Sequence, residues 1–406
     1  MINLLLKLVL ACPLLALISG DLPAESNENS KKPLKVFILA GQSNMQGHAR
    51  TETLEYMAND AESAKTLGEI LNQDGSARIH KDVWINSLSS AGVKHGQLTT
   101  GFGADENKIG PELMFGIQTS KKLDEPILII KTAWGGKSLH TDFRPPSAAK
   151  FRFSEQQLKK IAKQGKDADA LLQEKHKASG EYYRLMVNHI RSVLDDISST
   201  YKGYDSEVGF ELAGFVWFQG WNDMVDNGVY PNRNRPGGFD TYTQLLTQFI
   251  RDVRNDLNAH ELPFVIGVMG AGGPTAQYGK SQTRNKKIHQ HFRDAMSATA
   301  ANKEFQGNVS NVFTERYWDN ELGVLKERET QINNKIRQLR RKDKMKQPEA
   351  KERKEEMMAE QFTAEELVKL RAGVSNQAYH YLGSAKIMTG IGHGFAEAMT
   401  GLLKQQ

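Results

Sequence analysis

The sequence predicts an α/β protein, a doubly wound, flavodoxin-like sandwich of three layers in which helices cover both faces of a parallel sheet. Short apolar runs recur along the chain, and helical stretches separate them. The runs are apolar throughout, which is typical of strands buried on both faces and therefore of a parallel sheet. With 406 residues, 39% of them hydrophobic, the chain is long enough for one large domain or two ordinary ones.

Six apolar runs are expected to form the strands. They cover residues 35–40, 82–88, 126–133, 211–220, 263–270 and 309–315. Between the third and fourth runs, the stretch that begins at Glu181 has a helical stripe of apolar residues, formed by Met186, Ile190, Val193 and Ile197. We expect this stretch to be a crossover helix that packs against the sheet.

The first 20 residues have the pattern of a signal peptide. Lys7 precedes an apolar stretch, small residues end it, and a polar segment follows. Because the stretch is short for a membrane span, we expect cleavage and a secreted or periplasmic location, with an uncleaved anchor as the alternative. Residues 21–33 are expected to be a tether, and residues 34–406 the folded domain.

Cysteine content and charge exclude several classes of function. The only cysteine, Cys12, lies inside the predicted signal segment. Cleavage after Gly20 therefore leaves no disulfide, no thiolate nucleophile and no cysteine-ligated metal. The formal net charge of +5 is small and spread along the chain, so it gives no indication of a nucleic acid partner.

Two segments are expected to be helical insertions in the domain. Residues 147–180 contain a capping-box pattern from Ser154 to Gln157. Residues 322–372 are expected to form a charged helical hairpin, in which Pro348 separates the two helices and Thr363 caps the second one. The first helix of this hairpin has an apolar face made of Leu325, Ile332, Ile336 and Leu339.

Ser43 directly follows the first apolar run and precedes an expected helix. Ligands of open α/β sheets bind at the carboxyl ends of the strands, so its hydroxyl should point into that crevice. Its N–H would lie at a helix N-terminus, which suits a nucleophile whose own amide helps to hold an oxyanion. A simple turn at the end of a strand is the alternative.

Three further blocks carry candidate residues. Gly110 stands before Pro111 in a tight turn, where glycine lets a backbone N–H approach a ligand. After the fourth run, Asn222 offers an amide donor for an oxyanion, and Trp221 would stack on a sugar ring or belong to the core. His380 precedes the final helix and is the best placed of the 11 histidines for a general base.

Together, these four blocks resemble those of SGNH/GDSL hydrolases. The first block, "FILAGQSNMQG", is most similar to the branch of sialate O-acetylesterases and acetylxylan esterases, carbohydrate esterase family 6. The resemblance covers approximately residues 35–143, 205–320 and 374–403, and it does not include the two expected insertions. It implies the SGNH-type α/β/α fold and a reaction that requires no metal or organic cofactor.

The resemblance also implies a role for each matching residue. Ser43 would be the nucleophile and His380 the general base. The oxyanion hole would consist of the N–H of Ser43, the N–H of Gly110 and the side chain of Asn222. The branch often has Gln-Gly-Glu at positions 219–221, where this chain has Trp221 in place of the glutamate.

The loop over residues 131–147 looks like the rim of a site. It follows the third run and contains Trp134, Lys137, His140 and Arg144. A basic, aromatic rim suits an acidic sugar such as a sialic or uronic acid, and an ordinary solvated loop is the alternative. The candidate substrate-binding residues are therefore Gln42, Trp134, Arg144, Gln219 and Trp221.

The acid of the expected triad is not apparent. The family usually has an aspartate three residues before the histidine, where this chain has Gln377. A neutral amide orients an imidazole but stabilises imidazolium less well than a carboxylate does. An acid from another strand end, a Ser-His dyad, and a weak or inactive esterase all stay open as explanations. The candidate acids near strand ends are Asp223, Glu315 and Asp319.

The sequence thus predicts an exported serine esterase that removes O-acetyl groups from carbohydrates through an acetyl-enzyme on Ser43. The alternative from another class is a carbohydrate-binding protein on a degenerate esterase fold, which Gln377 favours. The joint presence of the other four block residues argues against it. A lipid or aryl esterase is a third possibility, which the polar rim disfavours.

Overall fold

The computed structural model of the protein describes residues 32–405. The predicted signal peptide and most of the predicted tether lie outside the described residues. A seven-stranded sheet has the order β4-β3-β6-β1-β7-β8-β9. Its strands are β1 (Leu34–Gly41), β3 (His80–Ser89), β4 (Gly92–Leu98), β6 (Ile127–Ala133), β7 (Phe210–Phe218), β8 (Phe264–Val268) and β9 (Val309–Phe313).

Every strand pair of this sheet is parallel except β3 with β4, which confirms the predicted fold class. β6 is buried along its whole length, as expected for a strand covered on both faces. In the register of the sheet, Gly41 at the end of β1 lies beside Ala133 of β6 and Phe218 of β7. The residues that follow these three strands therefore emerge together at one edge.

The antiparallel edge strand β4 was not among the predicted strands. Its residues are a mixture of polar, glycine and apolar residues, and most of them are exposed, so no apolar run marks it in the sequence. β4 pairs with β3 and covers what would otherwise be an open parallel edge. A separate two-stranded sheet joins β2 (Ala49–Arg50) to β5 (Lys108–Ile109).

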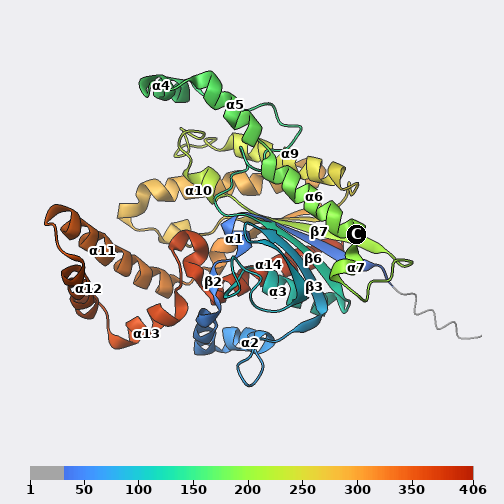
Figure 1. The fold of residues 1–406 in the computed structure, drawn as a ribbon, viewed down its shortest axis with the longest axis horizontal. Helices are drawn as coiled ribbons and strands as arrows, with labels where there is room; N and C mark the ends of the chain where they lie inside the picture. The colour runs from blue at the N-terminus through green and yellow to red at the C-terminus, as the bar shows by residue number, and fades with distance from the viewer. Residues whose placement is uncertain (1–31, 406) are drawn as a thin grey trace, which may run out of the picture. The chain divides into compact units, whose positions relative to one another are not determined.

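Helices pack on both faces of the sheet. On one face lie α3 (Glu112–Leu123) and α14 (Ala385–Leu403), and on the other lie α6 (Glu181–Asp195), α9 (Asp240–Asp256) and α10 (Thr283–Ala298) (Figure 1). Shorter helices lie in the connections: α1 (Ser43–Gln46), α2 (Ala61–Ile70), α7 (Ile197–Thr200) and α8 (Trp221–Val225), with 3₁₀ turns η1 (Thr51–Asn59), η2 (Thr275–Gln277), η3 (Lys280–Gln282), η4 (Thr299–Ala301), η5 (Lys303–Phe305), η6 (Thr314–Tyr317) and η7 (Ala378–Gly383).

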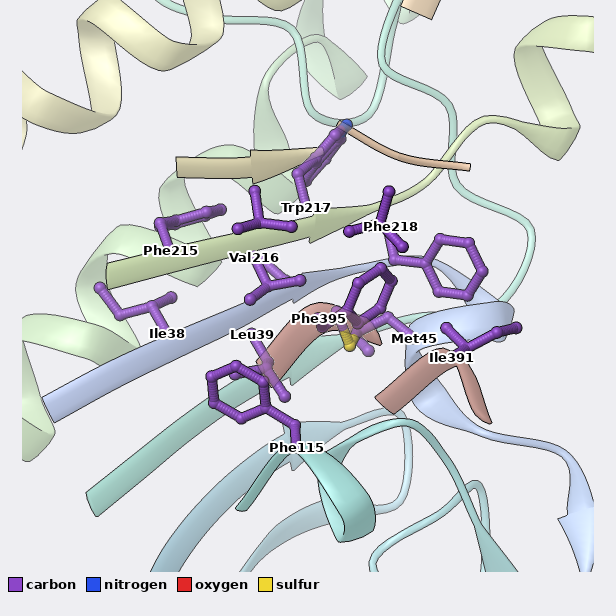
Figure 2. Packing of buried hydrophobic residues seen from close by; sticks show 14 of the residues in the cluster. Ile38, Leu39, Met45, Phe115, Phe215, Val216, Trp217, Phe218, Ile391 and Phe395 are labelled. Atoms are coloured by element: carbon purple, nitrogen blue, oxygen red, sulfur yellow. The ribbon is translucent and has the colours of Figure 1, made fainter. Parts of the chain in front are cut away.

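Consecutive residues of β7 serve the two faces, as the alternation of a strand requires. The ring of Trp217 contacts Phe249 of α9 at 4.3 Å between centroids, and the ring of Phe218 contacts Phe395 of α14 at 5.3 Å. Trp217, Phe218 and Phe395 are labelled among the packed side chains of Figure 2. Each such burial stabilises the fold by about 1.5–3 kcal/mol, so these contacts fix the strand ends that carry the site.

The expected crossover helix is α6. Met186, Ile190 and Val193 are buried along one stripe of it, as the spacing predicts. Ile197, the fourth member of the predicted stripe, is also buried but belongs to the short helix α7. α6 packs against β6, and in the sequence it lies between β6 and β7.

The first predicted insertion contains α4 (Glu155–Lys163) and α5 (Ala168–Ala178). The predicted capping box is present: Ser154 Oγ accepts a hydrogen bond from the N–H of Gln157 at 3.3 Å. Gln157 Oε1 accepts one in return from the N–H of Ser154 at 2.9 Å. The two bonds satisfy N–H groups that the first helical turn leaves open.

The second predicted insertion has three helices rather than two: α11 (Asn320–Lys342), α12 (Gln347–Gln361) and α13 (Ala364–Gly373). The predicted capping box from Thr363 to Glu366 starts α13. This α11–α13 segment has a small core of its own, formed by Leu325, Ile332, Ile336, Ala350, Phe362 and Leu370. Within residues 32–405, no helix has the length and hydropathy that a membrane span requires.

Candidate active site

Ser43 is the first residue of α1, the single helical turn after β1. Gly47 ends this turn with a φ of 92°, and a Cβ on it would lie 2.3 Å from Gly110 Cα, so only glycine fits. Ser43 is 6% exposed. Its hydroxyl has no hydrogen bond with any described residue and is not among the polar atoms closed off from solvent. A ligand at this edge can therefore reach Oγ.

His380 lies in η7, and η7 packs against α1. The imidazole of His380 stacks on that of His48, with 4.2 Å between ring centroids and 4° between planes. Burial, followed by the positive charge of Lys108, lowers the pKa of His380 to about 4. The structure thus brings His380 to the segment of Ser43 with its ring neutral at pH 7, the form that accepts a proton.

Asn376 fixes the tautomer of His380. The N–H of Gln377 donates to Asn376 Oδ1 at 2.8 Å, which identifies that atom as the amide oxygen, since a backbone N–H needs an acceptor. The same oxygen lies 3.2 Å from His380 Nδ1. Nδ1 must therefore carry the hydrogen, and the free lone pair of the ring is on Nε2.

The backbone directly after His380 is strained. Tyr381 and Leu382 both have left-handed conformations, with φ values of 51° and 62°. Each costs roughly 1–2 kcal/mol for a residue with a Cβ. The buried Tyr381 hydroxyl offsets part of this cost, because it accepts from the N–H of Gly270 at 2.7 Å and bonds Thr314 Oγ1 at 2.6 Å. This anchoring holds the turn that presents His380.

None of the predicted acids contacts the ring of His380. Asp223 is fully buried and accepts from the N–H groups of Leu139 and His140, at 2.8 and 3.1 Å, and from Tyr230 Oη at 3.1 Å. Burial raises the pKa of Asp223. Asp223 therefore anchors the loop after β6 instead of orienting the imidazole of His380.

The two other predicted acids and Gln377 are also engaged elsewhere or point away. Glu315 forms an ion pair with Arg293. Asp319 caps α11 by accepting from the N–H of Leu322 at 3.0 Å. The side chain of Gln377 is exposed, and only its backbone carbonyl meets His380, by accepting the N–H at 2.9 Å. Asn376, one residue earlier, takes the orienting position.

The N–H of Gly110 is already occupied. It donates to Glu112 Oε1 at 2.8 Å. Glu112 in turn pairs with the buried Lys131 at 2.7 Å, and Lys131 Nζ also donates to the carbonyls of Gln46 and Phe102 at 2.9 and 2.8 Å. All three protons of the ammonium are satisfied, so this buried pair fixes the end of α1 to the Gly110 turn.

Gly135 lies beside Ser43 instead. A Cβ on Gly135 would be 3.9 Å from Ser43 Cβ, and the N–H of Gly135 has no hydrogen-bond partner in the described part of the chain. Asn222 lies on α8, the short helix after β7, and its N–H donates to Gln42 Oε1 at 3.4 Å. Its side chain is half-buried and makes no hydrogen bond with residues 32–405. The N–H of Gly135 is thus a free donor beside Ser43. Asn222 offers a free side-chain amide, and its backbone is bonded to Gln42, the residue before Ser43.

Four of the five predicted substrate-binding residues hold the protein together. Gln42 and Gln219 are buried and hydrogen-bonded to each other at 3.3 Å. Trp134 is buried against the ring of Tyr182 at 5.2 Å between centroids. Arg144 donates to the carbonyls of Ala149 and His140, at 2.6 and 2.8 Å, so it closes its own loop. Trp134 and Arg144 of the predicted rim therefore make contacts within the protein, and the role of this loop in substrate binding stays a prediction.

The fifth predicted residue, Trp221, remains partly exposed at the site. Its ring lies 5.5 Å from that of Tyr379, and Tyr379 lies edge-on to His380 at 4.5 Å. These side chains form an aromatic surface next to the general-base candidate. Tyr379 is 38% exposed, so it can contact a ligand.

His48, Asn376 and Gly135 were not among the residues predicted for the site. Asn376 could have been found, because an amide four residues before the histidine in a turn can reach the ring. Gly135 belongs to a glycine pair directly after a buried strand, which is another detectable signal. No pattern in the sequence indicates that His48 meets His380, since the two are joined only by tertiary packing.

Within residues 32–405, no group of three or more His, Cys, Asp and Glu side chains is arranged to hold a metal ion. The profile of one protein family, described as "Carbohydrate esterase, sialic acid-specific acetylesterase", matches residues 33–311. The match ends before α11 begins. No curated protein matches the chain.

Several solved structures are similar to the chain, including these two. One is a protein from Arabidopsis thaliana, with 16% identity, coverage of 70% of this chain and 86% of that one, and a TM-score of 0.38. The other is a carbohydrate acetylesterase from Xanthomonas citri, with 16% identity, coverage of 68% and 49%, and a TM-score of 0.37. The match spans about half the length of the Xanthomonas protein.

Proposed function

Because the chain belongs to the carbohydrate esterase family of sialic acid-specific acetylesterases, we propose that it hydrolyses O-acetyl esters of carbohydrates by a serine mechanism. Ser43 is the nucleophile and His380 the general base. One arrangement carries this proposal. The neutral imidazole of His380, protonated on Nδ1, stacks on His48, in the segment that begins at Ser43.

The reaction proceeds through an acetyl-enzyme. Ser43 Oγ attacks the acetyl carbonyl carbon while His380 Nε2 takes the hydroxyl proton. The tetrahedral intermediate breaks its bond to the sugar oxygen, which leaves with the proton from Nε2. Water then attacks the acetyl group, gives its proton to Nε2, and acetate leaves as that proton returns to Oγ.

We assign three donors to the developing oxyanion. They are the N–H of Ser43 at the start of α1, the N–H of Gly135 beside it, and the side-chain amide of Asn222, which has no partner among residues 32–405. Gly110, the donor that the resemblance implies, stays bound to Glu112 in this mechanism. Donors that are held in place before the reaction stabilise the intermediate without further reorganisation.

Asn376 takes the part of the triad acid. As an acceptor for Nδ1–H it holds the imidazole in the productive tautomer, as the asparagine of Cys-His-Asn proteases does. It carries no charge, so it stabilises imidazolium less than a carboxylate does. We therefore expect an active enzyme of moderate rate, which corresponds to a Ser-His dyad oriented by an amide.

The first test is acetate release from an acetylated polysaccharide mixture and from p-nitrophenyl acetate. Ser43→Ala and His380→Ala are each expected to lose activity by at least about a thousandfold. His393→Ala is the matched control, because His393 is an exposed histidine on α14. Wild type no faster than Ser43→Ala would refute the serine mechanism.

A carbohydrate-binding protein without turnover is the second candidate function. The observation that favours it is the absence of a carboxylate from the ring of His380 within the described residues. In that case glycans bind to wild type and Ser43→Ala alike, and neither releases acetate. A lipid or aryl esterase would instead hydrolyse a long-chain ester faster than an acetylated sugar.

We also propose export and an assignment to carbohydrate esterase family 6. Export rests on the signal-peptide pattern of the first 20 residues, and the family on the Gly-Gln-Ser-Asn-Met block. A mature protein in the secreted or periplasmic fraction that begins after Gly20 would support export. A full-length N-terminus would favour the uncleaved anchor. Acetate release from acetylated xylan would support the family assignment.

A further inference from the structure

A cavity of about 430 Å³ lies next to the candidate active site, between three segments of the chain. One wall is the loop after β8, the second is the first part of α11, and the third is the Gln377–Tyr379 stretch directly before His380. Its lining includes Gln277, Tyr278, Trp318, Asn320, Val324 and Tyr379. The cavity thus combines aromatic rings with amides.

Tyr379 connects this cavity to the catalytic residues. It lines the cavity, and its ring also contacts the rings of His380 and Trp221, at 4.5 and 5.5 Å between centroids. α11 packs against η7, the turn that carries His380. A chain of sugars whose acetyl group is at Ser43 can therefore continue past Tyr379 into the cavity.

The ring of Trp318 is held as a fixed wall. It fits between two glycines: a Cβ on Gly273 would lie 2.6 Å from its Cδ1, and a Cβ on Gly323 would lie 2.7 Å from its Nε1. The indole N–H has no partner among residues 32–405 and is not closed off from solvent. It is free to donate to a sugar hydroxyl, as an aromatic residue with a polar edge does.

The charge of the cavity is neutral to acidic. Lys326 is the single basic residue of its lining, and its ammonium is paired with Glu329 at 2.7 Å. Glu327 adds a negative charge to the same wall. With no unpaired cation in this lining, a carboxylated sugar would lack a counterion, whereas amides and aromatic rings suit neutral, hydroxyl-rich sugars.

From this geometry we propose that the cavity is a sugar-binding subsite for a neutral acetylated oligosaccharide, built by α11 and by Tyr379, whose ring contacts His380. The subsite rests on the proposed esterase function and names its substrate class. It depends on α11, which lies outside the residues that match the family profile. The proposed substrate is thus a neutral sugar, whereas the loop over residues 131–147 led us to expect an acidic one.

The test compares acetylated xylo-oligosaccharides, acetylated oligogalacturonides and p-nitrophenyl acetate. We expect wild type to have a kcat/KM at least tenfold higher for the neutral than for the acidic oligosaccharide. Val324→Arg places a long cation in the cavity from an exposed position of α11. It should lower the ratio of kcat/KM for xylo-oligosaccharide to kcat/KM for p-nitrophenyl acetate at least tenfold.

Val368→Arg is the matched control, because Val368 is an equally exposed valine on α13 that does not line the cavity. It should leave the ratio unchanged. A wild type that prefers the acidic substrate, or a Val324→Arg variant with the wild-type ratio, overturns the subsite while the esterase stands. If no substrate is hydrolysed, calorimetry measures the affinity for deacetylated xylo-oligosaccharide instead. An affinity that is tenfold weaker in Val324→Arg than in wild type supports the subsite. Equal affinity in the two proteins, or no binding by wild type, overturns it.

Discussion

The imidazole rings of His48 and His380 lie parallel, 4.2 Å apart between centroids, and so join the segment that follows Ser43 to the turn before the last helix. Burial, followed by the neighbouring His380, lowers the pKa of His48 to about 4. Two neutral rings stack without charge repulsion. The pair therefore favours the unprotonated form of both histidines at neutral pH.

The acidic limb of the pH profile should be displaced to low pH. Because protonated His380 cannot accept the proton of Ser43, kcat/KM falls as the pH drops through the pKa of His380, which is about 4. An ordinary histidine would give a midpoint at about 6.5. Rates of p-nitrophenyl acetate hydrolysis across the acidic range measure the midpoint, with circular dichroism to exclude unfolding. A midpoint at the ordinary value contradicts this environment for the base.

The charge of Lys108 contributes to that displacement. Lys108→Met removes a cation that disfavours imidazolium, so the pKa of His380, and with it the acidic midpoint, should rise. Lys121→Met serves as the control, because Lys121 is an exposed lysine paired with Glu69 on α2. If both variants keep the wild-type midpoint, then burial alone sets the pKa.

Replacement of Asn376 tests its orienting role. Asn376→Ala should lower kcat by about 10–100-fold with little change in KM, because the imidazole loses the acceptor that selects its tautomer. Asn376→Asp should raise both kcat and the acidic midpoint, since a carboxylate stabilises imidazolium. Asn334→Ala, at an exposed position of α11, is the control. A fully active Asn376→Ala variant would show that the ring needs no such partner.

Asn222 is expected to act on the transition state alone. Asn222→Ala should reduce kcat by roughly 10²–10³-fold, which is the usual loss for one oxyanion donor. KM and the free energy of unfolding should stay close to wild type, because the side chain makes no hydrogen bond with residues 32–405. A rise in KM of this size, without a fall in kcat, would instead assign Asn222 to substrate binding.

Replacing only one partner of the buried ion pair of Lys131 and Glu112 should strongly lower the free energy of unfolding. Lys131→Met leaves the carboxylate of Glu112 buried without its cation, and should lower the free energy of unfolding by about 3–5 kcal/mol. Combined with Glu112→Gln, the loss should be smaller than the sum of the single changes. Urea denaturation measures both. Lys351→Met, at an exposed ion pair, is the control, and additive losses would rule out the coupling.

The fold could be predicted because its strands are buried on both faces. Each continuous apolar run of the sequence corresponds to a parallel strand, with ends that differ by a few residues. β4 escaped prediction because an edge strand that is largely exposed needs no apolar residues. The extra helix of the α11–α13 segment escaped for a related reason, since α12 buries only Ala350 and has no apolar stripe to mark it.

The site could be predicted only in part. Ser43 and Asn222 follow strands directly, so topology alone brings them to one edge. His380 and Asn376 depend on the strained turn after them, and His48 on packing between distant segments. Trp134, like the basic residues beside it, resembled a binding surface, but the loop folds back onto buried Asp223. Sequence composition does not distinguish these two outcomes.

The α11–α13 segment leaves and rejoins the domain at neighbouring points, because Leu322 near its start packs against Gly373 at its end. Its length is therefore independent of the spacing of the strands. The segment could therefore differ in length without moving a strand end. The proposed sugar contacts on α11 and the proposed nucleophile after β1 thus lie on parts of one polypeptide that can vary separately.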